Sequence, residues 1–380
     1  MITGPRYIED PETLVAGNAV RLLRNGREAF PAWLAAIDSA LTRVSLEMYI
    51  FSDDTIGRRF AGALLAASGR GVAVRLLYDF VGCRDTPAAF FDRLRTGGVH
   101  TIAYHRPRFG RRRFWMLWRR NHRKTLVCDG RVAFTGGLNI SDEWLEAEAG
   151  GGGWHDAAVR LEGPAVAMIE ATFLATWNRR ARKRARLAPE GLGKLPAAGE
   201  ARVAVVSNSE LVDRFVIRRA GLHAAREGRR RIVLANPYFV PDRGILRALE
   251  NGVARGLDVR LLVPRVSDSR LIDLAARAVF EPLLRAGVRI WRSPAFVHTK
   301  LLAVDDEFVS IGSYNLDHRS LAYNLELVVN ILDGPCNAAA VSMLEEDMAA
   351  SKELTLAAFE RRSWFVRLLE RFAYALRRWL

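Results

Sequence analysis

The sequence has few cysteines, no long apolar run and comparatively few acidic residues. Its three cysteines, Cys83, Cys128 and Cys336, lie far apart, which argues against a disulfide framework or a zinc site and suits a reducing compartment. No uninterrupted apolar run approaches the ~18 residues of a membrane span. Residues 1–10 also lack the apolar core of a signal peptide. We therefore expect any membrane contact to be peripheral.

Basic residues outnumber acidic ones, with 57 Lys and Arg against 42 Asp and Glu, and the formal net charge is +15. This charge predicts a polyanionic partner: nucleic acid, anionic lipid or a phosphorylated substrate. Half of the 380 residues are hydrophobic, which is enough for two domains with sizeable cores. No metal-ligand cluster is visible in the sequence, so we expect neither a metal nor a cofactor.

The chain carries the same motif twice. One copy consists of His122, Lys124, Asp129, Gly136 and Asn139, and the other of His298, Lys300, Asp305, Gly312 and Asn315. Every matched residue is displaced by 176 positions, which indicates an internal duplication. In a strand, residues two apart lie on the same face, so each copy presents an imidazole and an ammonium together.

Strand and helix patterns alternate around both motifs, which predicts an α/β fold. The first half predicts helices at 28–41, 55–69 and 165–179, and strands at 44–51, 72–78 and 154–163. The second half predicts strands at 231–239 and 257–263 around a helix at 243–254. We divide the chain into a first domain at 18–180, a basic, Pro/Gly-containing linker at 181–200, a second domain at 201–345 and a C-terminal basic amphipathic helix at 346–380.

Two further stretches combine basic and aromatic residues. In residues 106–120, several arginines alternate with aromatics, which fits a helix with one packed face, a segment that gathers anionic lipid, or a surface that stacks on nucleic acid. On a helix, residues 363–380 would place their large apolar side chains along one side and four arginines on the other. We interpret this tail as a helix lying in a membrane surface; the alternative is a helix docked on the second domain.

The paired pattern H-x-K-x4-D-x6-G-[GS]-x-N resembles that of the phospholipase D superfamily, and residues 313–326 more narrowly resemble its bacterial cardiolipin synthases. The resemblance extends from about residue 30 to about residue 345. It implies two similar α-β-α sandwich domains, packed about a pseudo-twofold axis with the active site at their interface.

The resemblance also implies a phosphatidyltransferase that makes cardiolipin from phosphatidylglycerol through a covalent phosphatidyl-histidine. The alternatives are a phospholipase D that hydrolyses phospholipid headgroups and a nuclease of the same superfamily. The expected partner is an anionic phospholipid membrane, at the cytoplasmic face of a bacterial cell, with no nucleic acid involved and with the chain acting as a monomer.

By this resemblance His122 is the nucleophile, and His298 protonates the departing alcohol and activates the accepting one. Charge on the phosphate would be stabilised by Lys124, Lys300, Asn139 and Asn315. Ser313 would add a hydroxyl on one side only, because Gly137 occupies the matched position.

Four carboxylates accompany the motifs. We expect Asp156 to orient His122 and Glu326 to orient His298, the alternative for each being a surface charge. Asp129 and Asp305 belong to the same catalytic motif, but we interpret them as structural residues that anchor the turns before Gly136 and Gly312.

Overall fold

In the residues that the structure describes, one continuous sheet of 15 strands runs through both halves: each half contributes seven equivalent strands, and one further short strand near the C-terminus lies at an edge. This computed structural model describes residues 5–105, 119–187, 195–209 and 213–379. The first half contains β1 (Leu14–Arg24), β2 (Arg43–Met48), β3 (Ala73–Asp79), β4 (His100–Tyr104), β5 (Thr125–Cys128), β6 (Val132–Gly136) and β7 (Ala157–Glu162). The second contains β8 (Ala201–Ser207), β9 (Arg231–Ala235), β10 (Asp258–Pro264), β11 (Arg289–Ser293), β12 (Leu301–Val304), β13 (Phe308–Gly312) and β14 (Leu327–Leu332).

The strand order shows the duplication directly. A short strand near the C-terminus, β15 (Lys352–Leu354), forms one edge, and the order is β15-β11-β10-β9-β12-β13-β14-β8-β1-β7-β6-β5-β2-β3-β4. The antiparallel β8–β1 pair forms a seam between the halves. Apart from β15, the strands on one side of this seam follow one another in the same order as their equivalents on the other side. The fold is therefore the expected pair of similar α/β domains related by an approximate twofold axis.

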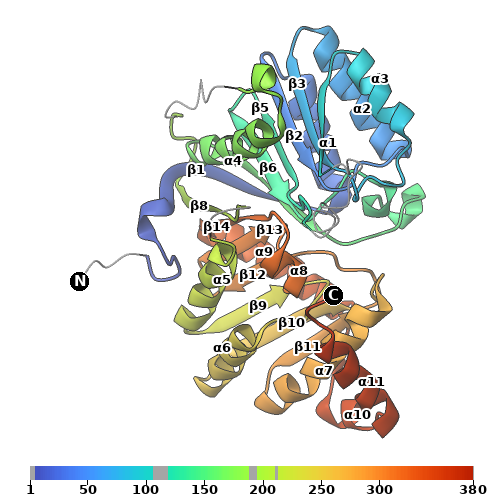
Figure 1. Cartoon of the computed structure of the whole chain (residues 1–380). Helices are drawn as coiled ribbons and strands as arrows, with labels where there is room; N and C mark the ends of the chain where they lie inside the picture. The colour runs from blue at the N-terminus through green and yellow to red at the C-terminus, as the bar shows by residue number, and fades with distance from the viewer. Residues whose placement is uncertain (1–4, 106–118, 188–194, 210–212, 380) are drawn as a thin grey trace.

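Helices cover both faces of each half. In the first half, α1 (Asn25–Asp38), α2 (Thr55–Gly69) and α3 (Ala88–Thr96) lie on one face and α4 (Ala165–Arg180) on the other (Figure 1). The second half has α5 (Val216–Glu227), α6 (Arg243–Ala254), α7 (Arg270–Ala286), α8 (His318–Ala322) and α9 (Gly334–Ala349). The chain continues through α10 (Leu356–Glu360) and α11 (Trp364–Ala375).

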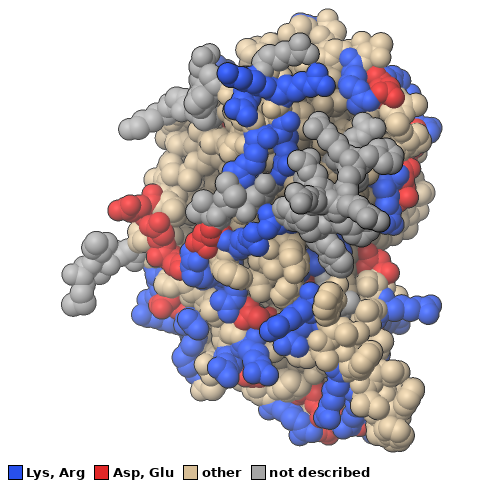
Figure 2. Space-filling view, in the orientation of Figure 1, with Lys and Arg blue, Asp and Glu red and all other residues tan. Residues whose placement is uncertain are grey.

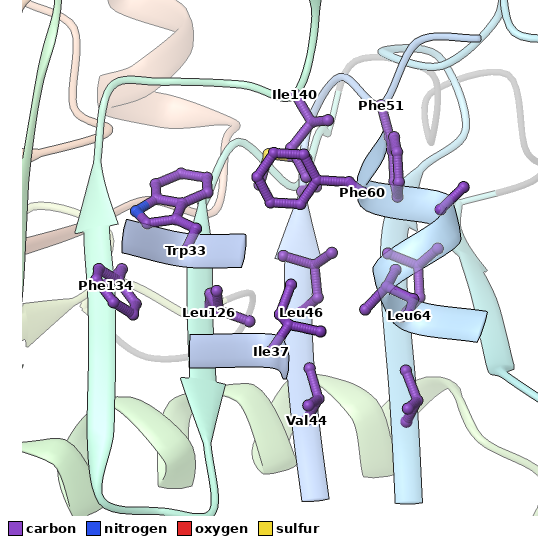
Figure 3. Packing of buried hydrophobic residues seen from close by; sticks show 14 of the residues in the cluster. Trp33, Ile37, Val44, Leu46, Phe51, Phe60, Leu64, Leu126, Phe134 and Ile140 are labelled. Carbon is purple, nitrogen blue, oxygen red and sulfur yellow. The ribbon is translucent and has the colours of Figure 1, made fainter. Parts of the chain in front are cut away.

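Apolar packing fixes the helices on the sheet. In the first half, Trp33 and Phe60 meet edge to face at 6.2 Å between ring centroids, above buried strand residues such as Leu46 and Leu126 (Figure 3). A separate core cluster includes Val166 of α4 and residues of α9, and so joins the two halves. This shared core holds the domains together where the motifs meet.

The helices predicted at 55–69 and 243–254 are confirmed as α2 and α6. Each begins with an aspartate whose side chain accepts a backbone hydrogen bond: Asp54 from Gly57 at 2.8 Å, and Asp242 from Gly244 at 2.6 Å. The strand predicted at 231–239 is shorter, because Pro237 has no N–H to continue the ladder beyond β9.

The C-terminal stretch differs from the single helix expected within 346–380. It contains the end of α9, then β15, α10 and α11. Residues 352–354 join the edge of the sheet by pairing with β11, because an edge strand offers unpaired backbone groups. The second half therefore extends beyond residue 345.

Candidate active site

Two backbone contacts between the halves position the motif histidines. The N–H of His122 donates to the carbonyl of Leu325 at 2.9 Å, and the N–H of His298 donates to that of His155 at 2.7 Å. Each motif thus lies against the segment that leads into β14 or β7 of the other half. Both histidines line one cavity of about 460 Å³, to which both halves contribute residues.

The carboxylate that holds each imidazole comes from the other half. Nδ1 of His122 lies 3.1 Å from both carboxylate oxygens of Glu326, and Nδ1 of His298 lies 2.6 Å from Oδ2 of Asp156. The pairing expected from the sequence, Asp156 with His122 and Glu326 with His298, is therefore wrong. The reason is the backbone contact between halves, which places each histidine beside the strand start of the opposite domain.

Glu326 is fully buried, and its oxygens are held by several donors. Ser320 Oγ donates to it at 2.8 Å and Asn324 Nδ2 at 3.3 Å, and Ser313 Oγ also donates to it. Burial alone would raise the pKa of this carboxyl, but His122 and the other nearby cationic and donor groups lower it below its usual value. Glu326 is therefore an ionised, fixed acceptor for the imidazole.

Asp156 is held in the same way. Trp144 Nε1 donates to Oδ2 at 2.9 Å, and the N–H of Ala157 donates to Oδ1 at 2.8 Å. Burial would raise the pKa of Asp156, yet Lys300 and His298 lower it below its usual value. Neither Asp156 nor Glu326 is the surface charge that the sequence left as an alternative.

Burial controls the protonation of both imidazoles. Burial, opposed by Glu326 and reinforced by Lys124, lowers the pKa of His122 to about 4. Burial together with Lys300 lowers the pKa of His298 to about 3. Both rings are then neutral at neutral pH, with Nδ1–H donated to a carboxylate and the lone pair carried by Nε2.

The two motif lysines lie close to the histidines. Lys124 Nζ donates to the carbonyl of His122 at 2.7 Å, and Lys300 Nζ donates to the carbonyl of His298 and lies 3.0 Å from its Nε2. Burial lowers the pKa of Lys300 to about 8 and also lowers that of Lys124. A bound phosphate would restore the positive charges that burial disfavours.

Asn139 and Asn315 both line the cavity. The side-chain oxygen of Asn139 accepts from the N–H of Ile50 at 3.0 Å, which directs the amide NH₂ away from that backbone. The side-chain oxygen of Asn315 is buried without a hydrogen-bond partner among the residues described. Both amides are thus placed to contact a ligand, which an apolar side chain could not do.

The difference between Gly137 and Ser313 follows from the size of the two carboxylate pockets. A Cβ at position 137 would lie 2.1 Å from Oδ1 of Asp156, so only glycine leaves room there. Ser313 has that room, and its hydroxyl donates to Glu326. The serine therefore supports a carboxylate and does not face the cavity.

Aromatic side chains around the histidines were missed by the sequence analysis. The ring centroid of Tyr49 lies 4.7 Å from that of His122. The ring centroids of Trp144 and Trp154 lie 5.2 Å and 5.5 Å from that of His298. Tyr49 comes directly after β2, at the carboxyl end of a parallel strand, where ligands bind in open α/β sheets. That position is the signal that could have revealed it.

The structure does not bring Asp129 and Asp305 to the histidines. They follow β5 and β12 and adopt positive φ values of 54° and 52°. Asp129 accepts the N–H groups of Leu41, Thr42 and Arg43 at 2.7–2.9 Å, and Asp305 accepts those of residues 229–231. Both are therefore structural residues, as the sequence indicated, but they anchor the segments that lead into β2 and β9 and not the turns before Gly136 and Gly312.

Three expectations from the sequence concern the basic-aromatic segment, a metal site and a membrane span. Residues 106–118 of the basic-aromatic segment lie outside the described residues. Within those described, no group of three or more His, Cys, Asp and Glu side chains could hold a metal ion. No helix in the same part of the chain is both long and apolar enough to cross a membrane.

Similarity to known proteins agrees with this geometry. Residues 33–176 and 221–348 match the family described as "Cardiolipin synthase, PLD-like domain". The chain is 35% identical over 350 residues to cardiolipin synthase A of Pseudomonas syringae pv. syringae, covering 90% of this chain and 71% of that protein. It is 36% identical over 347 residues to cardiolipin synthase A of Pseudomonas putida, covering 90% and 71%.

Solved structures show the same fold at low identity. Phosphatidylserine synthase of Haemophilus influenzae superposes with a TM-score of 0.71 at 14% identity, covering 95% of each chain. Polyphosphate kinase of Porphyromonas gingivalis gives 0.57 at 13% identity, covering 95% of this chain and 53% of that one. The PLD-like family model, matched once in each half, identifies the phospholipase D superfamily, and the structure places one His-Lys motif from each domain at a common cavity. Within this superfamily, the chain belongs to the family of cardiolipin synthase, PLD-like domains.

Proposed function

We propose that this protein is a phosphatidyltransferase that makes cardiolipin from two molecules of phosphatidylglycerol. The observation that supports this most strongly is the pair of buried imidazoles lining one cavity, each fixed through Nδ1 by a carboxylate of the other half. Such a pair can act on one phosphate in two roles, as nucleophile and as proton donor. The cardiolipin synthases to which the chain is similar supply the substrate class.

In the first step, Nε2 of His122 attacks the phosphorus of phosphatidylglycerol. The bond from phosphorus to the glycerol oxygen breaks, and that oxygen takes a proton from His298 as glycerol leaves. The product is a phosphatidyl group on His122. Although burial keeps both rings neutral in the free protein, the negative phosphodiester raises the pKa of the imidazoles and so favours the protonated His298 that this step needs.

In the second step, a second phosphatidylglycerol takes the place of glycerol. His298 accepts the proton of its glycerol hydroxyl, the oxygen attacks phosphorus, and the bond from phosphorus to His122 breaks. Cardiolipin leaves with both histidines restored. Lys124, Lys300 and the two asparagines would stabilise charge on the non-bridging oxygens in both steps, because they are fixed before the reaction begins.

The surroundings of the histidines support His122 as the nucleophile. Lys300 Nζ lies 2.8 Å from Nδ1 and 3.0 Å from Nε2 of His298, and the ring is enclosed by Trp144 and Trp154. The ring of His122 contacts one tyrosine and is held by a carboxylate with three side-chain donors. A nucleophile needs an unobstructed nitrogen, which favours His122 over His298 for that role.

The substrates are membrane lipids, so the protein works at a phospholipid surface. We infer that it binds peripherally at the cytoplasmic face of a bacterial membrane, in keeping with its net charge of +15. The test of the reaction is incubation of the purified protein with phosphatidylglycerol vesicles, with products resolved by mass. Cardiolipin with one glycerol per cardiolipin is the expected result; phosphatidic acid and glycerol without cardiolipin would identify a hydrolase.

A further inference from the structure

The helix α11 presents its apolar side to solvent. Ten large hydrophobic side chains are exposed in the described part of the chain, and six of them lie on α11 or just after it: Trp364, Phe365, Leu368, Leu369, Phe372 and Trp379. We call these six the apolar stripe. Their exposed fractions range from 40% for Leu369 to 75% for Trp364. An amphipathic helix of a globular protein normally turns such a stripe toward the core, so this helix is inverted.

The opposite side of α11 is held by buried charge. Glu370 is 2% exposed and pairs with Arg277 of α7 at 3.0 Å. It also accepts from Arg362, which pairs with Glu281 of α7 at 3.1 Å. Next to this network, Ala373 packs into the core of the second half. Since a buried, paired carboxylate fixes which side of a helix faces inward, the outward direction of the stripe is built into the domain.

The helix α11 also lies close to residues that line the active-site cavity. It packs along α7, and the N-cap of α7, Ser269, and Ile272 in its first turn line the active-site cavity. Beyond α11, Arg377 and Arg378 line a second cavity, of about 420 Å³, and Asp317 lines both cavities. His318 and Leu321 of α8 line this second cavity too, so the residues just after α11 lie beside α8. The apolar stripe therefore ends close to the cavity where the reaction takes place.

We propose that the apolar stripe docks on an anionic bilayer and sets the active-site cavity against the lipid surface. Two exposed arginines accompany the stripe, Arg371 next to Phe372 on α11 and Arg378 next to Trp379, so their guanidinium groups can reach phosphates while the stripe enters the headgroup region. Figure 2 shows an uncharged surface in the region of α11 with basic side chains beside it. A second copy of this chain would bring these same arginines together, which like charge disfavours. The choice of phosphatidylglycerol as the lipid rests on the proposed function.

The test uses the full chain with Phe365→Ser, Leu368→Ser and Phe372→Ser combined. Its control combines Leu41→Ser and Phe215→Ser, which replace exposed apolar side chains elsewhere. Co-sedimentation with vesicles of phosphatidylglycerol and phosphatidylcholine should fall at least about tenfold in the triple variant and stay within about twofold in the control. The melting temperature of the triple variant should stay within about 2 °C of the parent, because the replaced side chains are exposed in the folded protein.

Charge is tested separately with Arg371→Gln and Arg378→Gln combined. This variant should bind phosphatidylglycerol vesicles less tightly and depend less on salt, with little change on pure phosphatidylcholine. Full vesicle binding by the triple variant would overturn the proposal. So would a parent protein that is dimeric in solution and becomes monomeric in the triple variant, because the stripe would then be a subunit interface.

Turnover separates this proposal from the proposed function. With substrate in detergent micelles, the triple variant should lose far less activity than it loses on vesicles. If the parent protein transfers no phosphatidyl group in either form, the proposed function fails, while vesicle co-sedimentation still decides what the apolar stripe binds.

Discussion

Glu326, which precedes β14 in the second half, holds the imidazole of His122 in the first half, at 3.1 Å from Nδ1 to each carboxylate oxygen. The reciprocal contact joins Asp156 of the first half to His298 of the second at 2.6 Å. Each half therefore supplies a histidine that only the other half can orient. The roles of the two histidines can be tested through these partners as well as directly.

Replacing the histidines should separate the two steps. His122→Ala should abolish transfer and any covalent phosphatidyl-protein, whereas His298→Ala should stop turnover of phosphatidylglycerol because an alkoxide leaves poorly without a proton. With an aryl phosphodiester, whose leaving group needs no proton, His298→Ala should still form the adduct, detected by intact-protein mass. An adduct in His122→Ala and none in His298→Ala would reverse the assignment.

The carboxylates should act on the step of the histidine they hold. Glu326→Gln should slow adduct formation, and Asp156→Asn should slow turnover of phosphatidylglycerol more than adduct formation from an aryl ester. Each should cost roughly 10²–10⁴-fold, by analogy with the carboxylate of a serine-protease triad. Glu162→Gln is the control, because Glu162 is a half-buried carboxylate at the end of β7 that pairs with Arg160 and not with a motif histidine. Near-parent rates in both variants would remove the carboxylates from the mechanism.

The pH dependence should reveal Lys300. Burial lowers its pKa from 10.5 to about 8, so its positive charge is present below that pH and is lost as the pH rises through it. Because kcat/KM reports ionisations of the free protein, it should decline above about pH 8 and not only above pH 10. Lys300→Arg keeps its charge, so its residual activity should lack this decline. A parent profile that is flat up to pH 10 would contradict the lowered pKa.

A single methyl group added at position 137 tests whether Asp156 of the first half holds His298 of the second. In Gly137→Ala the added Cβ would lie 2.1 Å from Oδ1 of Asp156 and must displace that carboxylate from His298. We expect a loss of kcat comparable with that of Asp156→Asn. The control is Gly62→Ala in α2, where a Cβ meets no atom within 4 Å and helix propensity predicts about 0.5–1 kcal/mol of added stability. Parent-like kcat in Gly137→Ala would show that the carboxylate is not held there.

The features that the sequence predicted well are local or repeated. Helices α2 and α6 begin at aspartate caps, and their apolar spacing is visible in a dozen residues. The constant displacement of 176 residues between motifs required two equivalent domains, and the palindromic strand order is its structural counterpart. The motif also predicted which histidines and lysines would lie together. Duplication placed the same side chains at the same end of two equivalent strands, one in each half.

The features that the sequence could not predict depend on contacts between distant segments. The matched positions of Asp156 and Glu326 identified two carboxylates, but only the bridges between the halves decide which histidine each one reaches. The tail shows the same limit. Its periodicity predicted an apolar side and a basic side, but the partner of Glu370, which turns the apolar side outward, lies on α7.

The seam between β8 and β1 suggests how such a chain arose. With a palindromic strand order, two separate copies of one half could associate along the same seam, and each would lend its carboxylate to the other. Two such copies, once joined in one polypeptide, can diverge. Gly137 against Ser313, Asp156 against Glu326, and two tryptophans beside only one of the histidines are the marks of that divergence. An ancestral symmetric pair would have had interchangeable histidines; this descendant can give each a separate task.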